Sequence, residues 1–131
     1  MLITIDGTQG VQYNFIDADS LPVAATALAV ECPAEHIPDA IYAALDRIVM
    51  IRIPFASTSD GRGYSTASML REHGYRGRLR ARGQVISDQF RYAIECGFDE
   101  VEVDDNIAAR QPRELWRYEK TLSYRDKLFG V

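Results

Sequence analysis

The sequence predicts an α/β protein with a small parallel sheet built from successive βα units and an N-terminal β-hairpin. Strand-length runs alternate with stretches of helical spacing, the strands at residues 24–31, 48–53, 78–82 and 98–103 and the helices at residues 37–48, 64–73 and 85–95. The links between these elements are short, which is typical of right-handed βαβ crossovers and therefore of a parallel sheet. A half-barrel and a flavodoxin-like layout both fit this order.

The two ends of the chain are expected to add smaller elements. Residues 1–5 and 11–15 each alternate apolar and polar side chains around a glycine-containing link, which predicts the hairpin. Pro112 favours a last helix, and residues 121–124 favour a short final strand. We therefore expect a single domain over residues 1–131, with the hairpin at 1–17, the βαβ core at 24–104 and a C-terminal helix and tail at 108–131.

Composition and charge limit the classes of partner. The chain has 131 residues, of which 47% are hydrophobic and 26% charged, as in a globular domain with its own core. The net charge of −4 argues against nucleic acid as a partner. No apolar run approaches the roughly 18 residues of a membrane span, and residues 1–7 lack a basic leader. We expect a cytoplasmic protein without a membrane partner.

Cysteine and histidine are too scattered for a metal site. Cys32 and Cys96 form no closely spaced pair, and His36 and His73 are isolated. An iron–sulfur cluster usually needs about four cysteines, so one chain does not supply it. We expect Cys96 to be a buried, unpaired thiol at the end of a helix.

The loop that follows the apolar strand at residues 48–53 is the candidate site. Glycines can adopt backbone angles closed to other residues, and a helix start presents free N–H groups to an anion. The carboxyl ends of parallel strands meet at one edge of the sheet, where ligands bind. The predicted anion- or cofactor-binding residues are Asp60, Gly61, Arg62, Gly63, Tyr64, Ser65, Arg82, Asp88 and Gln89.

Several of these residues also have a purely structural interpretation. The Gly61-x-Gly63 spacing matches half of a dinucleotide fingerprint, but Thr66 stands at the third small position. Because half of the fingerprint is present, NADP and flavin stay open as cofactors. Arg82 would then be placed to bind the 2′-phosphate of NADP. Alternatively, Asp60 or Ser65 simply caps the helix. Asp88 and Gln89 would then only complement the dipole of the next helix.

The strand at residues 78–82 places three arginines on one side. Arg78, Arg80 and Arg82 alternate with apolar residues, and Glu100 and Glu102 alternate on the next strand. One interpretation is an anion-binding row. The other is a cross-strand charge ladder, which we favour for Arg78 and Arg80. Arg82 lies nearer the carboxyl end and is the better candidate for a ligand contact.

An ordered set of motifs closely resembles a bacterial family, domain-of-unknown-function family nine-three-four. The motifs are Asp60-Gly61-Arg62-Gly63-Tyr64-Ser65, Leu70-Arg71-Glu72, Gly74-Tyr75, Leu79-Arg80-Ala81, Asp88-Gln89 and Cys96-Gly97-Phe98-Asp99. Residue 84 departs from the family, because glutamine replaces its aspartate before Val85.

Members of this family are commonly labelled as oxidoreductases with a role in sulfite reduction. The resemblance implies a cytoplasmic oxidoreductase-type or accessory protein of assimilatory sulfite reduction, with sulfite reductase or its electron donor as a partner. The alternative is a non-catalytic interaction module that docks an acidic partner through its arginine-rich face.

Overall fold

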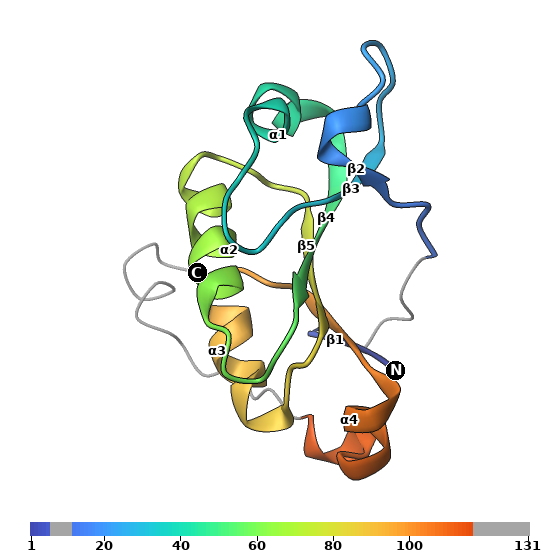
Figure 1. The fold of residues 1–131 in the computed structure, drawn as a ribbon, viewed down its shortest axis with the longest axis vertical. Helices are drawn as coiled ribbons and strands as arrows, with labels where there is room; N and C mark the ends of the chain where they lie inside the picture. Colours follow the sequence, from blue (N-terminus) through green and yellow to red (C-terminus); the bar gives the residue numbers. More distant parts are fainter. Residues whose placement is uncertain (6–11, 117–131) are drawn as a thin grey trace.

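The structure, a computed structural model, describes residues 1–5 and 12–116 of the chain. Six strands form one sheet in the order β1-β6-β5-β4-β3-β2 (Figure 1). They are β1 (Leu2–Thr4), β2 (Ile16–Asp17), β3 (Leu28–Glu31), β4 (Ile48–Phe55), β5 (Arg78–Gly83) and β6 (Glu100–Val103). Neighbours from β2 to β6 run parallel, and β1 is antiparallel to β6. The predicted α/β fold with a mainly parallel sheet is confirmed.

The helices between the parallel strands cover one face of this sheet (Figure 1). The α-helices are α1 (Asp39–Ala44), α2 (Arg62–Glu72), α3 (Phe90–Glu95) and α4 (Asp105–Arg110), and the short 3₁₀ helices are η1 (Ala18–Ser20), η2 (Leu45–Arg47), η3 (Ser87–Gln89) and η4 (Arg113–Leu115). Strands β2 to β6 lie in the same order in the sheet as in the chain. Right-handed crossovers that all step in one direction place their helices on the same side. A doubly wound, flavodoxin-like layout is therefore excluded. Among the described helices, none combines the length and apolar character that a membrane span requires.

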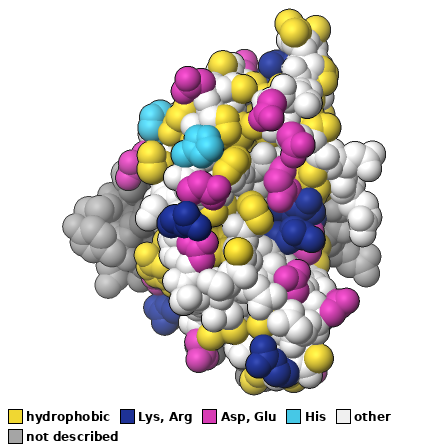
Figure 2. Space-filling model, viewed as in Figure 1, with side chains coloured by type: hydrophobic (Ala, Val, Ile, Leu, Met, Phe, Trp, Pro, Cys, Tyr) yellow, Lys and Arg dark blue, Asp and Glu magenta, His cyan; other side chains and the backbone are white. Residues whose placement is uncertain are grey.

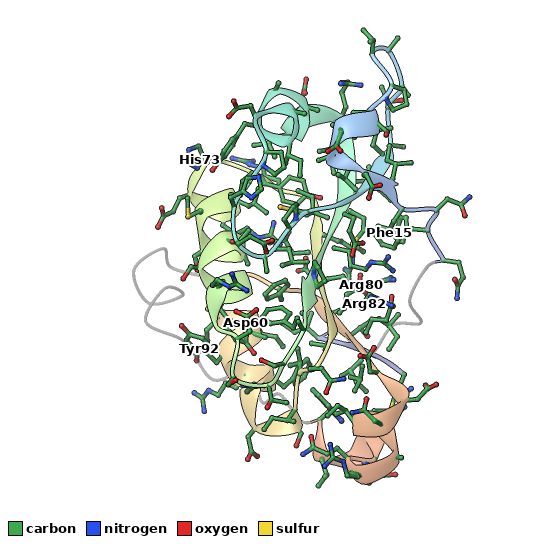
Figure 3. All side chains as sticks on the ribbon, viewed as in Figure 1. Phe15, Asp60, His73, Arg80, Arg82 and Tyr92 are labelled. Atoms are coloured by element: carbon green, nitrogen blue, oxygen red, sulfur yellow. The ribbon has the colours of Figure 1, made fainter. Side chains whose placement is uncertain are left out.

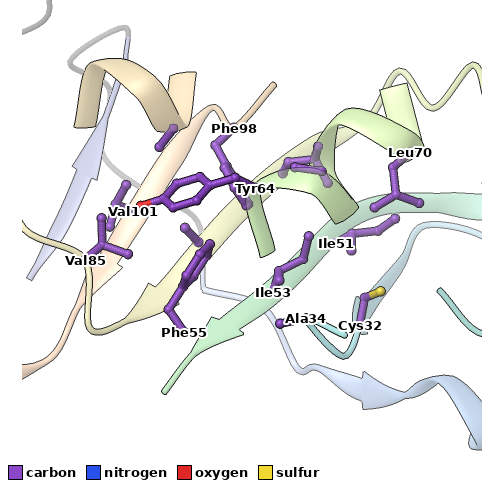
Figure 4. Packing of buried hydrophobic residues seen from close by; sticks show 14 of the residues in the cluster. Cys32, Ala34, Ile51, Ile53, Phe55, Tyr64, Leu70, Val85, Phe98 and Val101 are labelled. Carbon is purple, nitrogen blue, oxygen red and sulfur yellow. The ribbon is translucent and has the colours of Figure 1, made fainter. Parts of the chain in front are cut away.

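The core lies between this helical layer and the sheet. Inward-facing strand residues alternate along the chain and meet the buried faces of α2 and α3, as in the packing of Ile51, Ile53, Leu70, Phe98 and Val101 (Figure 4). Each of these five side chains is at most 1% exposed. The period of two in the strands is thus the cause of the layered core.

The opposite face of the sheet is charged, and within residues 1–5 and 12–116 it carries no helix between its strands. Residues 12–15 lie across part of it, with the guanidinium of Arg52 3.9 Å from the ring centroid of Phe15. The guanidinium of Arg80 is 5.6 Å from the rings of both Tyr13 and Phe15. Figure 3 shows Phe15, Arg80 and Arg82 together on this side. We call it the helix-free face.

The predicted N-terminal hairpin is wrong. Strand β1 pairs with β6, with Ile3 opposite Val101, and residues 12–15 form no strand. Pairing with β6 buries the apolar side of β1 in the core, where Ile3 is only 4% exposed. The alternation in residues 1–5 correctly predicted a strand, but it carries no information about which strand it pairs with.

Several predicted boundaries also move. Strand β4 continues through Pro54 to Phe55, because at Pro54 it has passed the end of β3 and pairs only with β5. The helix predicted from residue 85 begins as η3 and becomes α-helical only at Phe90. Helix α4 was not predicted, and the helix expected after Pro112 is the short η4. The strand expected at residues 121–124 lies outside the described residues.

Candidate functional site

A cleft of about 450 Å³ lies at the carboxyl edge of the sheet. The loops after β3, β4, β5 and β6 all contribute to it, as the parallel topology predicts. Its polar lining consists of Glu35, Asp60, Arg62, Arg82, Gln84 and Asp104. We call this the carboxyl-edge cleft.

Asp60 and Arg62 form a closed local unit at the start of α2. The Oδ1 atom of Asp60 accepts hydrogen bonds from the backbone N–H and from Nε of Arg62, both at 3.1 Å, and Oδ2 accepts one from Nη2 at 3.1 Å. These hydrogen bonds and the guanidinium charge lower the pKa of the Asp60 carboxyl below its ordinary value. The carboxylate therefore stays ionised and caps the helix start.

Arg82 approaches the same cleft from the end of β5. Its Nε donates to Oε2 of Glu102 at 3.1 Å, and its side chain is 44% exposed, compared with 63% for Arg62. Within residues 1–5 and 12–116, the terminal amino groups of Arg82 have no further acceptor, and neither has Nη1 of Arg62. Both guanidiniums can therefore bind an additional oxyanion.

The two arginines reach the cleft from opposite sides of the sheet. Figure 3 shows Arg82 on the helix-free face beside Arg80, whereas Asp60 lies on the side of α2. Besides the two guanidiniums, the lining contains three carboxylates, those of Glu35, Asp60 and Asp104. The lining is thus negatively charged overall, and a bound anion would have to be held by directed hydrogen bonds rather than by net charge.

The glycines and Tyr64 of the motif serve the fold instead of lining the cleft. Gly61 has φ −94°, and Gly63 lies within α2. The expectation that these glycines adopt backbone angles closed to other residues is therefore wrong at both positions. A Cβ on Gly63 would lie 2.5 Å from Cζ of Phe55, so this glycine allows α2 to pack closely on β4. Tyr64 is 5% exposed and packs on Phe55, and Ser65 is exposed on α2 away from the cleft lining.

Asp88 and Gln89 are not brought next to Arg82 in the cleft. The Nε2 of Gln89 donates to the carbonyl oxygen of Thr58 at 2.8 Å, and its Oε1 accepts from the backbone N–H of Ile86 at 3.2 Å. Gln89 thus ties the β4–α2 loop to η3. Asp88 is exposed at the start of the next helical segment.

Three further polar residues of the cleft were not predicted as site residues. The Nε2 of Gln84 donates to Asp104 at 2.9 Å and to Asn106 at 3.1 Å. Glu35 follows the carboxyl end of β3 and is exposed. The signal that could have found all three is their position in the segments that follow parallel strands: Gln84 and Asp104 come directly after β5 and β6, and Glu35 lies four residues beyond the end of β3. The sequence motifs point to the β4–α2 loop alone.

The charge ladder predicted for Arg78 and Arg80 is confirmed. Glu100 lies 3.4 Å from Nε of Arg78 and 3.5 Å from Nε of Arg80, and Glu102 accepts a hydrogen bond from Nη1 of Arg80 at 3.0 Å. Arg82 joins the ladder through Glu102. The arginine row is therefore matched by glutamates, and Figure 2 shows acidic and basic side chains interspersed over the visible surface.

Both cysteines are free thiols, as predicted. Cys32 is fully buried, and burial raises the pKa of its thiol to about 12. Cys96 is half-buried at the end of α3, so the prediction that it is buried is wrong. No group of three or more His, Cys, Asp or Glu side chains in the part of the chain that the structure describes is arranged to hold a metal ion.

Comparison with known proteins supports the resemblance seen in the motifs. No curated protein and no solved structure matches the chain. A bacterial family matches residues 29–127. This range includes all of β3 except Leu28, every later element to η4, and all the residues of the carboxyl-edge cleft. The chain belongs to this family, which is described as "Bacterial protein of unknown function (DUF934)".

Proposed function

We propose that this protein is a cytoplasmic accessory or oxidoreductase-type protein of bacterial sulfite reduction, and that its carboxyl-edge cleft binds a small oxyanion. The observation that carries the proposal is the convergence of Arg62 and Arg82, from different elements, on one cleft with hydrogen-bond donors to spare. Guanidinium groups bind oxyanions through parallel, charge-assisted hydrogen bonds. The motif resemblance supports sulfite reduction as the setting.

The size of the cleft bears on the form of the ligand. At about 450 Å³ it has room for more than a bare oxyanion. An oxyanion that is part of a larger cofactor, such as the phosphate of a flavin or a nicotinamide nucleotide, fits the same donors. Sulfite reductase or its electron donor is the proposed partner that supplies or uses the bound group.

Isothermal titration calorimetry with sulfite, sulfate and phosphate tests the proposal. Arg62→Ala and Arg82→Ala are each expected to weaken binding by about tenfold or more, because a hydrogen bond to a charged group contributes about 1.5–3 kcal/mol. Arg78→Ala is the matched control, because it removes the same group from the same strand at the end away from the cleft. Absence of binding in the parent protein, or an equal loss in the Arg78 variant, would refute the proposal.

A further inference from the structure

We infer that Asp60 is a built-in competitor for the oxyanion in the carboxyl-edge cleft, so that a ligand reaches the Nε and Nη2 donors of Arg62 only by displacing the Asp60 carboxylate. This inference rests on the proposed function and assigns Asp60 the opposite role to a ligand-binding residue. It makes the Asp60–Arg62 ion pair a closed state of the site.

The contacts of Asp60 are those of a bound oxyanion. Its two oxygens accept from the first backbone N–H of α2 and from two nitrogens of the Arg62 guanidinium, all at 3.1 Å. A helix start and a guanidinium are the donors that an external oxyanion would use. The carboxylate therefore stands where the ligand's oxygens would stand.

A ligand can reach the ion pair through Arg62, its exposed member. The Asp60 side chain is only 13% exposed, whereas Arg62 is 63% exposed and lines a cleft open to ligands. A carboxylate held two residues away acts at an effective concentration on the order of mM or more. A free oxyanion at lower concentration competes poorly for Arg62 unless Arg82 supplies a second anchor from the other side of the cleft.

The charge of the lining gives a control for the inference. Asp60 and Asp104 both line the cleft, but Asp104 accepts from Gln84 instead of from Arg62. Asp60→Asn and Asp104→Asn each remove one negative charge from the same lining. Only Asp60→Asn also releases the guanidinium of Arg62. A difference between the two variants therefore measures competition and not general electrostatics.

Calorimetric titration with inorganic phosphate and with sulfite tests the inference. Asp60→Asn is expected to bind each anion about tenfold more tightly than the parent, since one charge-assisted hydrogen-bonding pair is freed. Asp104→Asn is expected to change binding by a clearly smaller factor. The gain is expected to vanish in Asp60→Asn/Arg62→Gln, because the released guanidinium is then absent.

The outcomes separate the inference from the proposed function. Binding by Asp60→Asn that is equal to or weaker than that of the parent overturns the inference and leaves the proposed site standing. Binding by Asp60→Asn without measurable binding by the parent overturns the proposed function, because the cleft of the parent then holds no oxyanion, and it overturns with it the inference that rests on that function. Absence of binding in every variant overturns both. If Asp60→Asn does not fold, Asp60→Ser, which keeps one oxygen near the helix start, takes its place with the same expected gain.

Discussion

Gly61 and Gly63 look equivalent in the sequence but have different physical roles. A Cβ on Gly61 would meet no atom within 4 Å, whereas a Cβ on Gly63 would lie 2.5 Å from the ring of Phe55. That ring is itself held by Tyr64 and Phe98, at centroid distances of 4.8 Å and 5.9 Å. It therefore has little room to move. The glycine that matters to the fold is the one that the helix places against β4.

Gly63→Ala is expected to lower the free energy of unfolding by about 1–3 kcal/mol, because the added methyl overpacks the contact with Phe55. Gly61→Ala is the control and is expected to change it by less than about 1 kcal/mol. Urea unfolding followed by circular dichroism measures both. Equal losses in the two variants would contradict the close-packing explanation.

The two thiols are expected to differ in reactivity. Iodoacetamide at pH 8 should label the half-buried Cys96, whereas Cys32 should react only after unfolding in urea. Burial raises the pKa of Cys32 from 9.0 to about 12, so the unfolded chain loses its proton first. Its contribution to stability is complete below about pH 9 and is lost as pH rises towards about 12. Mass spectrometry of the labelled peptides decides the order of reaction, and rapid labelling of Cys32 in the native state would contradict it.

At the scale of the elements, the pairing of β5 with β6 could be predicted, but the burial of its charges could not. Strict alternation in both strands placed arginines opposite glutamates. The burial of the Arg80–Glu100 pair depends on residues 12–15, which lie over Arg80 and were expected in a hairpin. Arg80 and Glu100 are consequently 5% and 2% exposed. Sequence periodicity assigns a residue to a face, but it does not reveal what covers that face.

This burial sets the energetics of the ladder. Arg80→Met is expected to cost about 3–5 kcal/mol, because it leaves Glu100 buried with less compensation. Arg80→Met combined with Glu100→Leu is expected to be about as stable as the parent, or more so. The attraction within a buried ion pair only about offsets the free energy needed to desolvate its two charges. Arg82→Met, on the half-exposed end of the same strand, should cost less than about 1 kcal/mol.

Thermal and urea unfolding of the three variants compare them directly. A double variant as unstable as Arg80→Met would show that Arg80 contributes through packing on Tyr13 and Phe15, and would contradict the ion-pair account.

For the molecule as a whole, the sequence predicted the alternation of strands and helices but not their arrangement in space. The carboxyl-edge rule placed Arg62 and Arg82 at the same edge of the sheet, and the structure brings them to one cleft. The strand order and the single helical layer could not be predicted, because each crossover can step in either direction along a growing sheet. The partner of β1 could not be predicted either, because an edge strand of three residues fits any edge of suitable pattern.

The sheet combines local and distant pairings. Strands β2 to β5 each pair with the next strand in the chain, whereas the hydrogen bond from the N-terminal amine of Met1 to the carbonyl oxygen of Val103 spans 102 positions. Contacts of such sequence separation form late in folding, because their loop-closure entropy is large.

Ile3→Ala removes buried contacts of β1 and is expected to cost about 2 kcal/mol. Because β1 docks late, the cost should appear as unfolding roughly 30-fold faster with folding almost unchanged. Leu79→Ala, in the centre of the sheet, is the comparison and should slow folding. Stopped-flow chevrons of both variants measure the rates, and slower folding of Ile3→Ala would contradict late docking.

The same distant pairing has a consequence during synthesis on the ribosome. Strand β1 is made before its partner, which follows about 100 residues later, a delay of roughly 5 to 20 seconds at about 5–20 residues per second. During this time the backbone N–H and C=O groups of β1 lack their partner strand and are open to pairing with other chains. Its length of three residues then acts as a safeguard, because so short a strand pairs stably with nothing until β6 presents the matching register.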